Sequence, residues 1–291
     1  MIINKLNTFS EFENSYNKIF TNTSQVNHFQ ILDIQKIKDS IKEQKCYACL
    51  FKQNIFLLIS KWDFFDLLCF IGNEDFFYEN LITLEKAIEA DSKKTIRISA
   101  VGKINFESSD FYQSIKKAGF SLVKKISRYQ NRKNKHKLDD ILSLIENNSH
   151  NIGYASPDDA QKVQDFLLLY FDPIAHSVPE LSEIKKNILK KQVVCAKDPD
   201  GNIISISYFE IINKIYYGLF DYTLPKYRQD MVYIGIILFL KKKFEEMHNC
   251  VTRSYYWCDT DNKKTNRFAK EVERTRDGVY IYNLIFNFDK K

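Results

Sequence analysis

The feature that most limits the possible folds of this chain is a tight turn between two strand-like runs in its second half. The turn reads Asp198-Pro-Asp-Gly201, in which Pro presets one backbone angle and Gly accepts a conformation that other residues avoid. Residues 193–196 and 202–212, on either side, are rich in Val and Ile. Such runs around such a turn predict an antiparallel hairpin, so this half of the chain has to build a sheet.

Helical patterns surround the hairpin. The sequence Ser156-Pro-Asp-Asp159 starts the clearest of them, because Ser156 can cap the helix and Pro157 suits its first position, while Asp159 supplies an acid to the first turn. In the second half we predict helices at 156–170, 180–191, 229–246 and 263–272. Further strands are predicted at 214–223, 251–258 and 279–286. Helices and strands therefore alternate, which favours an α/β architecture with a mixed sheet.

The first half has a similar but shorter layout. Its predicted helices are 9–20, 31–43, 74–90 and 111–118. Its predicted strands are 46–52, 55–60, 64–71, 95–100 and 121–129. At 291 residues the chain is also too long for one average domain. We therefore predict two tandem domains, at 1–130 and 151–291, joined by a basic linker at 131–150.

The linker falls in the most basic part of the chain, between Lys124 and Lys137, where apolar residues have no regular spacing. The net charge is +6, but no aromatic platform motif accompanies the basic run, so a solvated segment is expected rather than a nucleic-acid contact. The longest apolar stretches, such as Val232 to Leu240, are far short of the roughly 20 residues that span a bilayer. With no secretory signal at the start, we expect a cytoplasmic protein with no membrane contact.

The six cysteines lie mostly inside strand-like runs, where a free thiol behaves as a small apolar side chain. Cys46 and Cys49 have the spacing of a redox or zinc pair, but no second pair accompanies them and they fall in a predicted strand. We therefore expect no metal site.

Three local signatures mark the second half. The Asp198–Gly201 turn separates the predicted strands 193–196 and 202–212, and Pro225-Lys-Tyr-Arg228 ends the strand 214–223 and opens the next helix. Asp259-Thr-Asp-Asn262 follows the strand 251–258. Together with the order of elements from Asn151 to Phe286, they resemble the GNAT superfamily of acyltransferases. The resemblance implies two tandem GNAT-like domains, of which the second is the more complete.

The resemblance implies an acyl donor that is a pantetheine thioester, such as acetyl-CoA. The strands 214–223 and 251–258, which are the fourth and fifth in the family's order, are expected to splay, so that the pantetheine arm pairs with free backbone of the fourth strand. The residues expected there are Tyr222, Thr223 and Leu224. The pyrophosphate is expected at the helix start near Arg228 and Gln229, because helix N-termini bind anions. Asn262 could hydrogen-bond a pantetheine amide, or could instead cap the helix that it precedes.

The sequence departs from the family pattern at this helix start. The pattern has Arg or Gln, two residues, a Gly, one residue, and then Gly or Ala. Here Met231 and Tyr233 fill both small positions, and Asp230 adds a negative charge near the expected pyrophosphate. The Tyr that is common on the fourth helix is replaced by Ala269. We therefore expect weak binding of coenzyme A.

The first half ends its last helix with Lys116-Lys-Ala-Gly-Phe120, which resembles the Gly-Phe that opens the last hairpin of GNAT domains. It shows no pyrophosphate loop, and Ile115 stands at the position of the catalytic Tyr. A truncated GNAT-like domain before a fuller one is similar to N-acetyltransferases that act on amino-sugar nucleotides. The first domain is then either a structural support or part of the acceptor site.

An amine acceptor has to lose a proton, so a carboxylate or an imidazole is needed near the reacting atoms. The candidates are Asp221, Glu210 and His176. Asp221 lies near the end of the fourth strand, where regular alternation would place it on the face of Tyr217 and Leu219. His176 lies in the loop that covers the acceptor pocket in this fold. Each has a plainer alternative as a solvated residue, and the aromatic residues 255–257 are expected to pack in the core.

The resemblance implies N-acyl transfer to an amine of a small molecule such as an amino-sugar nucleotide. The donor is either acetyl-CoA or an acyl-carrier protein, whose acidic surface would suit Lys226, Arg228 and the lysines at 241–243. The alternative from another class is a binding or scaffold protein that kept the fold and lost the chemistry.

Overall fold

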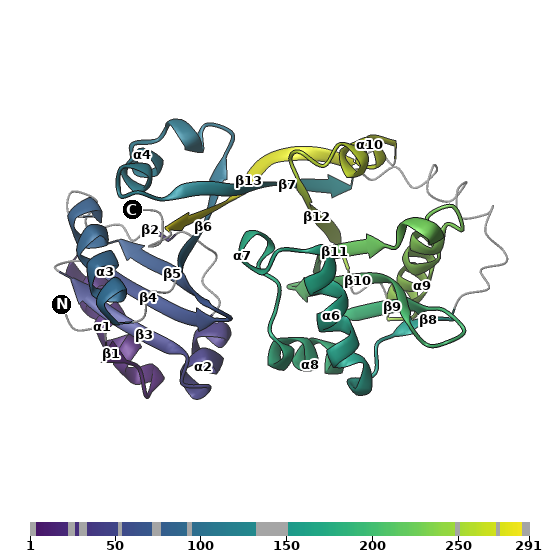
Figure 1. Ribbon diagram of the computed structural model, residues 1–291, viewed down its shortest axis with the longest axis horizontal. Coiled ribbons are helices and arrows are strands. Elements are labelled where there is room, and N and C mark those ends of the chain that lie inside the picture. The colour runs from purple at the N-terminus through teal and green to yellow at the C-terminus, as the bar shows by residue number, and fades with distance from the viewer. Residues whose placement is uncertain are drawn as a thin grey trace. The chain divides into compact units, whose positions relative to one another are not determined.

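The computed structural model describes residues 4–22, 27–28, 34–51, 54–71, 77–91, 95–131, 151–247, 251–271 and 274–286 (Figure 1). Within it the chain forms two compact units. The first unit consists of Met1–Lys125 and Val279–Lys291, and the second consists of Ile126–Gly278. No helix among the described residues is long and apolar enough to cross a membrane.

Two long strands each pass from one unit to the other. β7 (Ser121–Asn131) begins in the first unit and ends in the second, and β13 (Arg274–Phe286) begins in the second and ends in the first. The units therefore divide the chain differently from the predicted domains, because a strand joins whichever sheet satisfies its backbone, however distant in sequence. The strand predicted at 121–129 is present and extends to Asn131 in β7, and residues 132–150 of the predicted linker lie outside the described residues.

The first unit is built on a mixed sheet with the order β1-β3-β4-β5-β6-β13-β7, in which β5 and β6 are parallel. The strands not yet given are β1 (Asn4–Lys5), β2 (Asn27–His28), β3 (Cys46–Phe51), β4 (Asn54–Lys61), β5 (Phe64–Ile71) and β6 (Thr95–Lys103). Its helices are α1 (Phe9–Asn22), α2 (Ile34–Lys42), α3 (Phe77–Asp91) and α4 (Asp110–Lys117).

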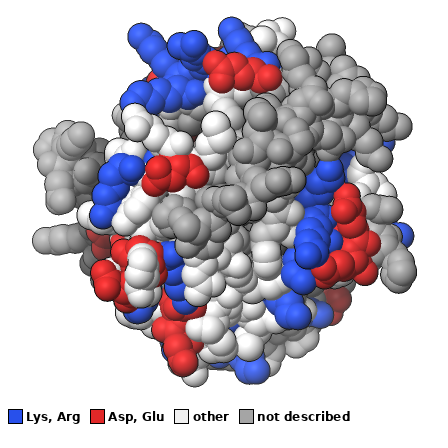
Figure 2. All heavy atoms as spheres, turned by 90° about the vertical axis from the view of Figure 1, so that its right-hand side faces the viewer, with Lys and Arg blue, Asp and Glu red and all other residues white. Residues whose placement is uncertain are grey.

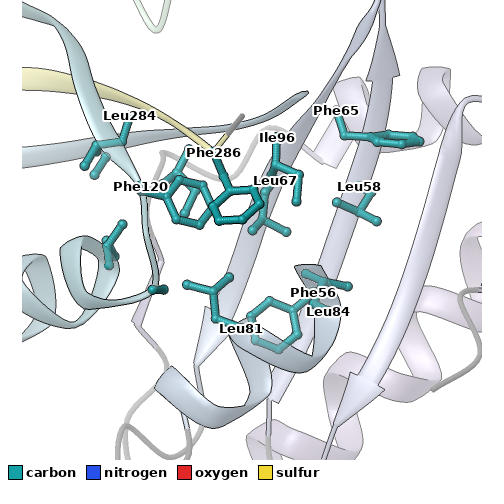
Figure 3. Packing of buried hydrophobic residues seen from close by; sticks show 14 of the residues in the cluster. Phe56, Leu58, Phe65, Leu67, Leu81, Leu84, Ile96, Phe120, Leu284 and Phe286 are labelled. Atoms are coloured by element: carbon teal, nitrogen blue, oxygen red, sulfur yellow. The ribbon is translucent and has the colours of Figure 1, made fainter. Parts of the chain in front are cut away.

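Two apolar layers stabilise the first unit, one on each face of its sheet. Alternate residues of β4 divide between them, because side chains along a strand point to opposite faces. Phe56 packs with residues of α3 and α4, whereas Leu57 packs with residues of α1 and α2. Figure 3 shows the first layer, in which the rings of Phe120 and Phe286 lie 5.6 Å apart. The end of β13 thus supplies core side chains to the first unit.

The second unit has the strand order β13-β7-β12-β11-β10-β9-β8. Its remaining strands are β8 (Asn151–Tyr154), β9 (Val193–Lys197), β10 (Ile203–Ile212), β11 (Ile215–Thr223) and β12 (Arg253–Asp259). Its helices are α6 (Ala160–Tyr170), α7 (Pro173–His176), α8 (Leu181–Leu189), α9 (Val232–Glu246) and α10 (Lys263–Glu271). α6 and α8 pack on one face of this sheet, and α9 packs on the other.

Local signals explain where several of these elements begin. The cap predicted at Ser156 is present, and Asp159 completes a capping box, since it accepts a hydrogen bond from the Ser156 backbone N–H at 2.8 Å. In the predicted hairpin turn, the N–H of Gly201 donates to the carbonyl of Asp198 at 3.0 Å. α9 starts at Val232 rather than at residue 229, because Met231 has a φ of 51° and so cannot extend a right-handed helix.

Candidate functional site

The two central strands of the second unit separate partway along their length. β11 and β12 pair in parallel only as far as Gly218 and Tyr256. The approach at this last pair is close, because a side chain at Gly218 would meet the Tyr256 ring at 2.8 Å. Residues 219–223 and 257–259, which follow, have no partner in each other (Figure 1). The predicted splay is therefore confirmed.

The splay leaves backbone groups of β11 on its open side. The N–H of Leu224, which directly follows β11, donates to the carbonyl of Ile204 in β10 at 2.9 Å. Because inward and outward groups alternate along an antiparallel strand, the N–H and C=O of Asp221 and Thr223 point away from β10, to the side that β12 has left. One of these groups is in use, since Arg228 Nε donates to the Thr223 carbonyl at 3.0 Å. An extended amide chain could pair with the others.

The N-terminus of α9 follows β11 closely. Met231 precedes the helix, and its carbonyl accepts from the N–H groups of Ile234 and Gly235 at 2.9 and 3.1 Å. The N–H groups of Val232 and Tyr233 make no backbone hydrogen bond within the described residues, as is usual for a first helical turn. Met231 thus adopts the left-handed backbone that favours Gly, while its side chain stays 48% exposed.

A polar cluster lies on the α9 face of the sheet, beside the splay. The Tyr233 hydroxyl, from the first turn of α9, donates to Asp221 Oδ2 at 2.9 Å. The Tyr233 ring lies 6.1 Å from the ring of Phe268 on α10. Arg274 is 9% exposed, and its guanidinium lies 3.5 Å from the centre of the Tyr256 ring. The side chain of Tyr233 therefore connects β11, α9 and α10.

The environment of Asp221 disfavours its charge. Burial raises the pKa of its carboxyl above the usual 3.8, and this effect exceeds the lowering by the Ser207 hydroxyl, the Arg274 charge and the Tyr233 hydroxyl. The Oδ1 atom is buried and has no hydrogen-bond partner among the described residues. The surroundings of Asp221 therefore favour its neutral form.

Asp221 faces the opposite side from the one that regular alternation predicts. The pairing of β10 with β11 is irregular, since Tyr208 pairs with Phe220 and Phe209 pairs with Gly218, which leaves Leu219 without a partner. This bulge reverses the faces of the residues that follow it. Asp221 consequently lies on the α9 face with Tyr216, whereas Phe220 packs on the other face with α6 and α8.

The segment from Phe171 to His176, which includes α7, contacts both splayed strands on the α6 face. Phe171 packs edge-on against Phe220 of β11, with ring centres 5.1 Å apart. His176 Nε2 lies 3.2 Å from Asp259 Oδ2, at the end of β12. Its Nδ1 lies 3.3 Å from the Asp172 carbonyl, so both ring nitrogens face oxygen atoms. The sequence identified Asp259 only as part of a signature and not as a partner of His176.

Aromatic side chains continue along the α6 face across β11 and β12. The rings of Tyr217 and Tyr255 stack, with centres 5.6 Å apart and an angle of 24° between planes. The Arg128 guanidinium lies 4.4 Å from the Tyr255 ring centre and 5.8 Å from that of Trp257. Its Nε donates to Asp277 at 2.7 Å. We name Tyr217, Tyr255 and Trp257 the aromatic row. None of these three belongs to the buried core, whereas Tyr256, the middle residue of the 255–257 run for which a core role was predicted, packs against the core on the α9 face.

The candidate catalytic residues do not come together at one point. Glu210 lies on the same face as the aromatic row, since it pairs in register with Tyr217 and its charge acts on the hydroxyl of Tyr208. His176 shares that face. Asp221, on the α9 face, is separated from both by the sheet. No group of acidic, His or Cys side chains among the described residues could hold a metal ion.

The candidate donor-binding residues have partners in the protein. Tyr222 stacks on Tyr170, with ring centres 4.1 Å apart. The Thr223 hydroxyl lies 2.7 Å from that of Ser205. Asn262 Oδ1 accepts from the N–H of Thr265 at 3.1 Å, so its side chain caps α10. Arg228 and Gln229 are exposed beside α9.

Charge on the surface is mixed rather than uniform. Figure 2 shows Lys and Arg interspersed with Asp and Glu on the face that it draws. On α9, Lys243 pairs with Glu246 at 2.8 Å, so part of the predicted lysine group is neutralised locally.

In the first unit, β5 and β6 also separate after a short parallel ladder, but another strand pairs with β5 there. β5 and β6 pair in parallel only from Phe64 to Asp66, and β2 then pairs with the end of β5. Where that parallel pairing ends, Asp66 accepts two hydrogen bonds from Arg97, at 2.9 and 2.6 Å, and both side chains are buried. The position that the family gives to a catalytic Tyr holds Ile115, which is fully buried.

No protein-family sequence model matches the chain, and neither does any curated protein sequence. Solved structures do match it. A tandem GNAT protein from the clavulanic acid biosynthesis pathway has a TM-score of 0.66 at 6% identity, over 98% of this chain and 98% of that one. A probable N-acyltransferase from Enterococcus faecalis V583 has a TM-score of 0.57 at 9% identity, over 98% of this chain and 72% of that one.

A third solved structure, a GNAT-family acetyltransferase from Colwellia psychrerythraea, has a TM-score of 0.51 at 11% identity, over 98% of this chain and all of that one (100%). These identities are too low to transfer an activity, but the coverage extends across both halves. The predicted architecture of two tandem GNAT-like domains is therefore confirmed.

Proposed function

We propose that this chain, which has the fold of tandem GNAT proteins, is an N-acyltransferase that moves an acyl group from a pantetheine thioester to the amine of a small molecule. The observation that carries the proposal is the splay of β11 from β12 in the second unit. The splay exposes the N–H and C=O of β11 on one side, which is the arrangement that two amides of a pantetheine arm require.

The second unit alone offers this arrangement among the described residues. In the first unit β2 occupies the corresponding strand edge, and the buried pair Asp66–Arg97 joins the two strands where their ladder ends. The donor therefore belongs to the second unit, and the first unit supports the acceptor side or the fold.

The residues on the α6 face suit the chemistry of the acceptor. In the proposed step the amine nitrogen attacks the thioester carbonyl, the C–S bond breaks, the amine loses a proton and the thiolate gains one. His176 is the proposed proton acceptor, because it lies beside the splay and Asp259 orients its ring through Nε2. The proton would go to Nδ1, whose 3.3 Å contact with the Asp172 carbonyl has to open when the amine binds. Asp259 would also stabilise the imidazolium that forms.

The aromatic row favours an acceptor that carries a ring. Tyr and Trp faces stack on flat or apolar ring surfaces. The carboxylate of Glu210, in register with Tyr217, would attract a protonated amine. An amino-sugar nucleotide combines these properties, and we propose this class as the acceptor.

Thr223→Pro tests the proposal at the backbone. Proline removes the N–H that points into the splay and leaves the β10 side of the ladder intact. We expect kcat/KM with a pantetheine thioester to fall about tenfold or more, whereas Thr223→Val, which keeps the N–H, stays near wild type. The measurement is release of free thiol with amino sugars and their nucleotides as acceptors. Equal activity of Thr223→Pro and Thr223→Val would show that the Thr223 N–H in the splay does not bind the donor.

The alternative, a binding or scaffold protein without catalysis, is favoured by one observation. The Tyr233 hydroxyl is bound to Asp221 beside the splay, so it is not available to a substrate. If donors bind by calorimetry but no acceptor releases thiol, this alternative replaces the enzyme.

A further inference from the structure

We propose that Tyr233 determines donor specificity: its side chain excludes the nucleotide of coenzyme A, so the donor is a thioester of pantetheine or phosphopantetheine that carries no nucleotide. The proposal rests on the function proposed above and specifies the donor of the same site. It assigns Tyr233 a role in selection and leaves the acyl-transfer chemistry to the α6 face.

The first support is how firmly Tyr233 is held. Its hydroxyl donates to Asp221 Oδ2 at 2.9 Å, and its ring lies 6.1 Å from Phe268 of α10. Swinging the ring out would take this donor away from a buried carboxyl whose Oδ1 has no hydrogen-bond partner among the described residues. Burying an unpaired polar atom is unfavourable, so Tyr233 has one stable position.

The second support is the charge balance of the cluster. Arg274 lies nearby, and its positive charge acts on both Asp221 and Tyr233. Its guanidinium is stacked on Tyr256 and lies 5.9 Å from the Phe268 ring centre. The cluster therefore joins β11, α9, α10 and β13 through side-chain contacts. Between α9 and α10, the contact is made by the rings of Tyr233 and Phe268.

The third support is the helix end itself. A diphosphate approaching the first turn of α9 would meet the Met231 side chain, which is 48% exposed. It would also meet Asp230, whose charge has the same sign as the phosphates. Small residues at such a turn would let the backbone approach a phosphate closely. Large and acidic residues at positions 230, 231 and 233 oppose that approach together.

What remains suits a shorter donor. The open side of β11 can still pair with the amides of a pantetheine arm. Arg228 is exposed, with its guanidinium 5.4 Å from the Tyr222 ring centre, and can meet one terminal phosphate. A single phosphate is what a phosphopantetheine arm carries, whether free or attached to a carrier protein.

The test compares four donors on the full-length protein: S-acetyl-pantetheine, S-acetyl-4′-phosphopantetheine, acetyl-CoA and an acetylated acyl-carrier protein. Binding is measured by calorimetry and transfer by thiol release. In the wild type we expect kcat/KM for acetyl-CoA to exceed that for S-acetyl-4′-phosphopantetheine by no more than about threefold. Tyr233→Ala should raise the ratio of kcat/KM for acetyl-CoA to kcat/KM for S-acetyl-4′-phosphopantetheine by about tenfold or more, since it opens space only for the nucleotide. Tyr233→Phe, which keeps the ring, should leave the ratio unchanged.

Phe268→Ala opens the same space from α10 without touching Asp221, and it serves if Tyr233→Ala does not fold. A wild-type preference for acetyl-CoA of more than about tenfold would overturn the proposal and leave the acyltransferase function intact. An unchanged ratio in both alanine variants would also overturn it. A preference for the acetylated carrier protein would support the proposal and identify that protein as the donor. Equal use of the carrier protein and of free S-acetyl-4′-phosphopantetheine would also support it and show that the arm alone is recognised. If no donor binds, the proposed function fails and the inference fails with it.

Discussion

The carboxyl of Asp221 is held where its charge is disfavoured, and this gives a prediction on stability. Because the folded state raises the pKa above the usual 3.8, it binds the proton more tightly than the unfolded state does. The contribution of Asp221 to stability is therefore most favourable at low pH and declines as pH rises from about 4 through the raised pKa. Asp221→Asn stays neutral and keeps an acceptor for Tyr233. We expect the free energy of unfolding of this variant, minus that of wild type, to increase over this range.

Chemical denaturation at about pH 3 and about pH 8 measures that difference. Asp198→Asn is a control of opposite sign, since the backbone N–H of Asn202 lowers the pKa of Asp198 and its charge is favoured when folded. A difference for Asp221→Asn that does not change with pH would show that burial does not control this group.

The contact between His176 and Asp259 gives a prediction on turnover. His176→Ala should lower kcat on the order of a hundredfold, because it removes the proposed proton acceptor, and donor binding should change little. Asp172→Ala is the matched control. It removes the cap that Asp172 Oδ1 gives to the N–H of Ala175 at 2.6 Å, and so loosens α7 while keeping the imidazole. If both variants lose activity equally, the loop matters through its shape and not through the imidazole.

At the level of elements, the buried pair of Asp66 and Arg97 joins β5 to β6 where their ladder ends. Asp66→Ala removes the two hydrogen bonds that the Arg97 guanidinium, only 1% exposed, donates to Asp66. We expect a loss of about 3–5 kcal/mol in the free energy of unfolding of the first unit. The exposed helical pair of Arg267 and Glu271 is the comparison, and Glu271→Gln should cost less than about 1 kcal/mol. Similar losses in the two variants would show that burial does not increase the effect.

Most elements could be predicted from the sequence, because their signals are local. The capping box at Ser156 and the turn at Gly201 depend on residues that are neighbours in the chain. Two features of the site could not be predicted this way. The bulge beside Leu219 depends on the registration of two strands, and it alone puts Asp221 on the α9 face. The start of α9 depends on Met231 adopting a backbone that sequence propensity assigns to Gly.

At the level of the whole chain, the residues least open to prediction were those brought together from distant segments. Arg128 and Asp277 lie 149 positions apart, yet their side chains hydrogen-bond beside the aromatic row. Local patterns placed Arg128 in a strand at 121–129, within a basic run, but nothing near it in the chain shows that this strand will pair with β12. The boundaries of the two units differ from those of the predicted domains for the same reason, since β13 begins in the second unit and ends in the first.

That passage of β13 leads to a test of the whole architecture. Residues 279–286 pair antiparallel with β6 from Lys103 to Ile96, and Tyr282, Leu284 and Phe286 enter the core of the first unit. A chain that stops after Gly278 loses this strand, so β6 loses one partner and the core is opened to water. We expect hydrogen exchange of the β6 amides to accelerate strongly, while the β9–β10 hairpin of the second unit keeps its protection. A chain that stops after Phe286 is the control and should exchange like the full-length protein. Continued protection of β6 in the shorter chain would mean that the first unit folds without the C-terminal strand.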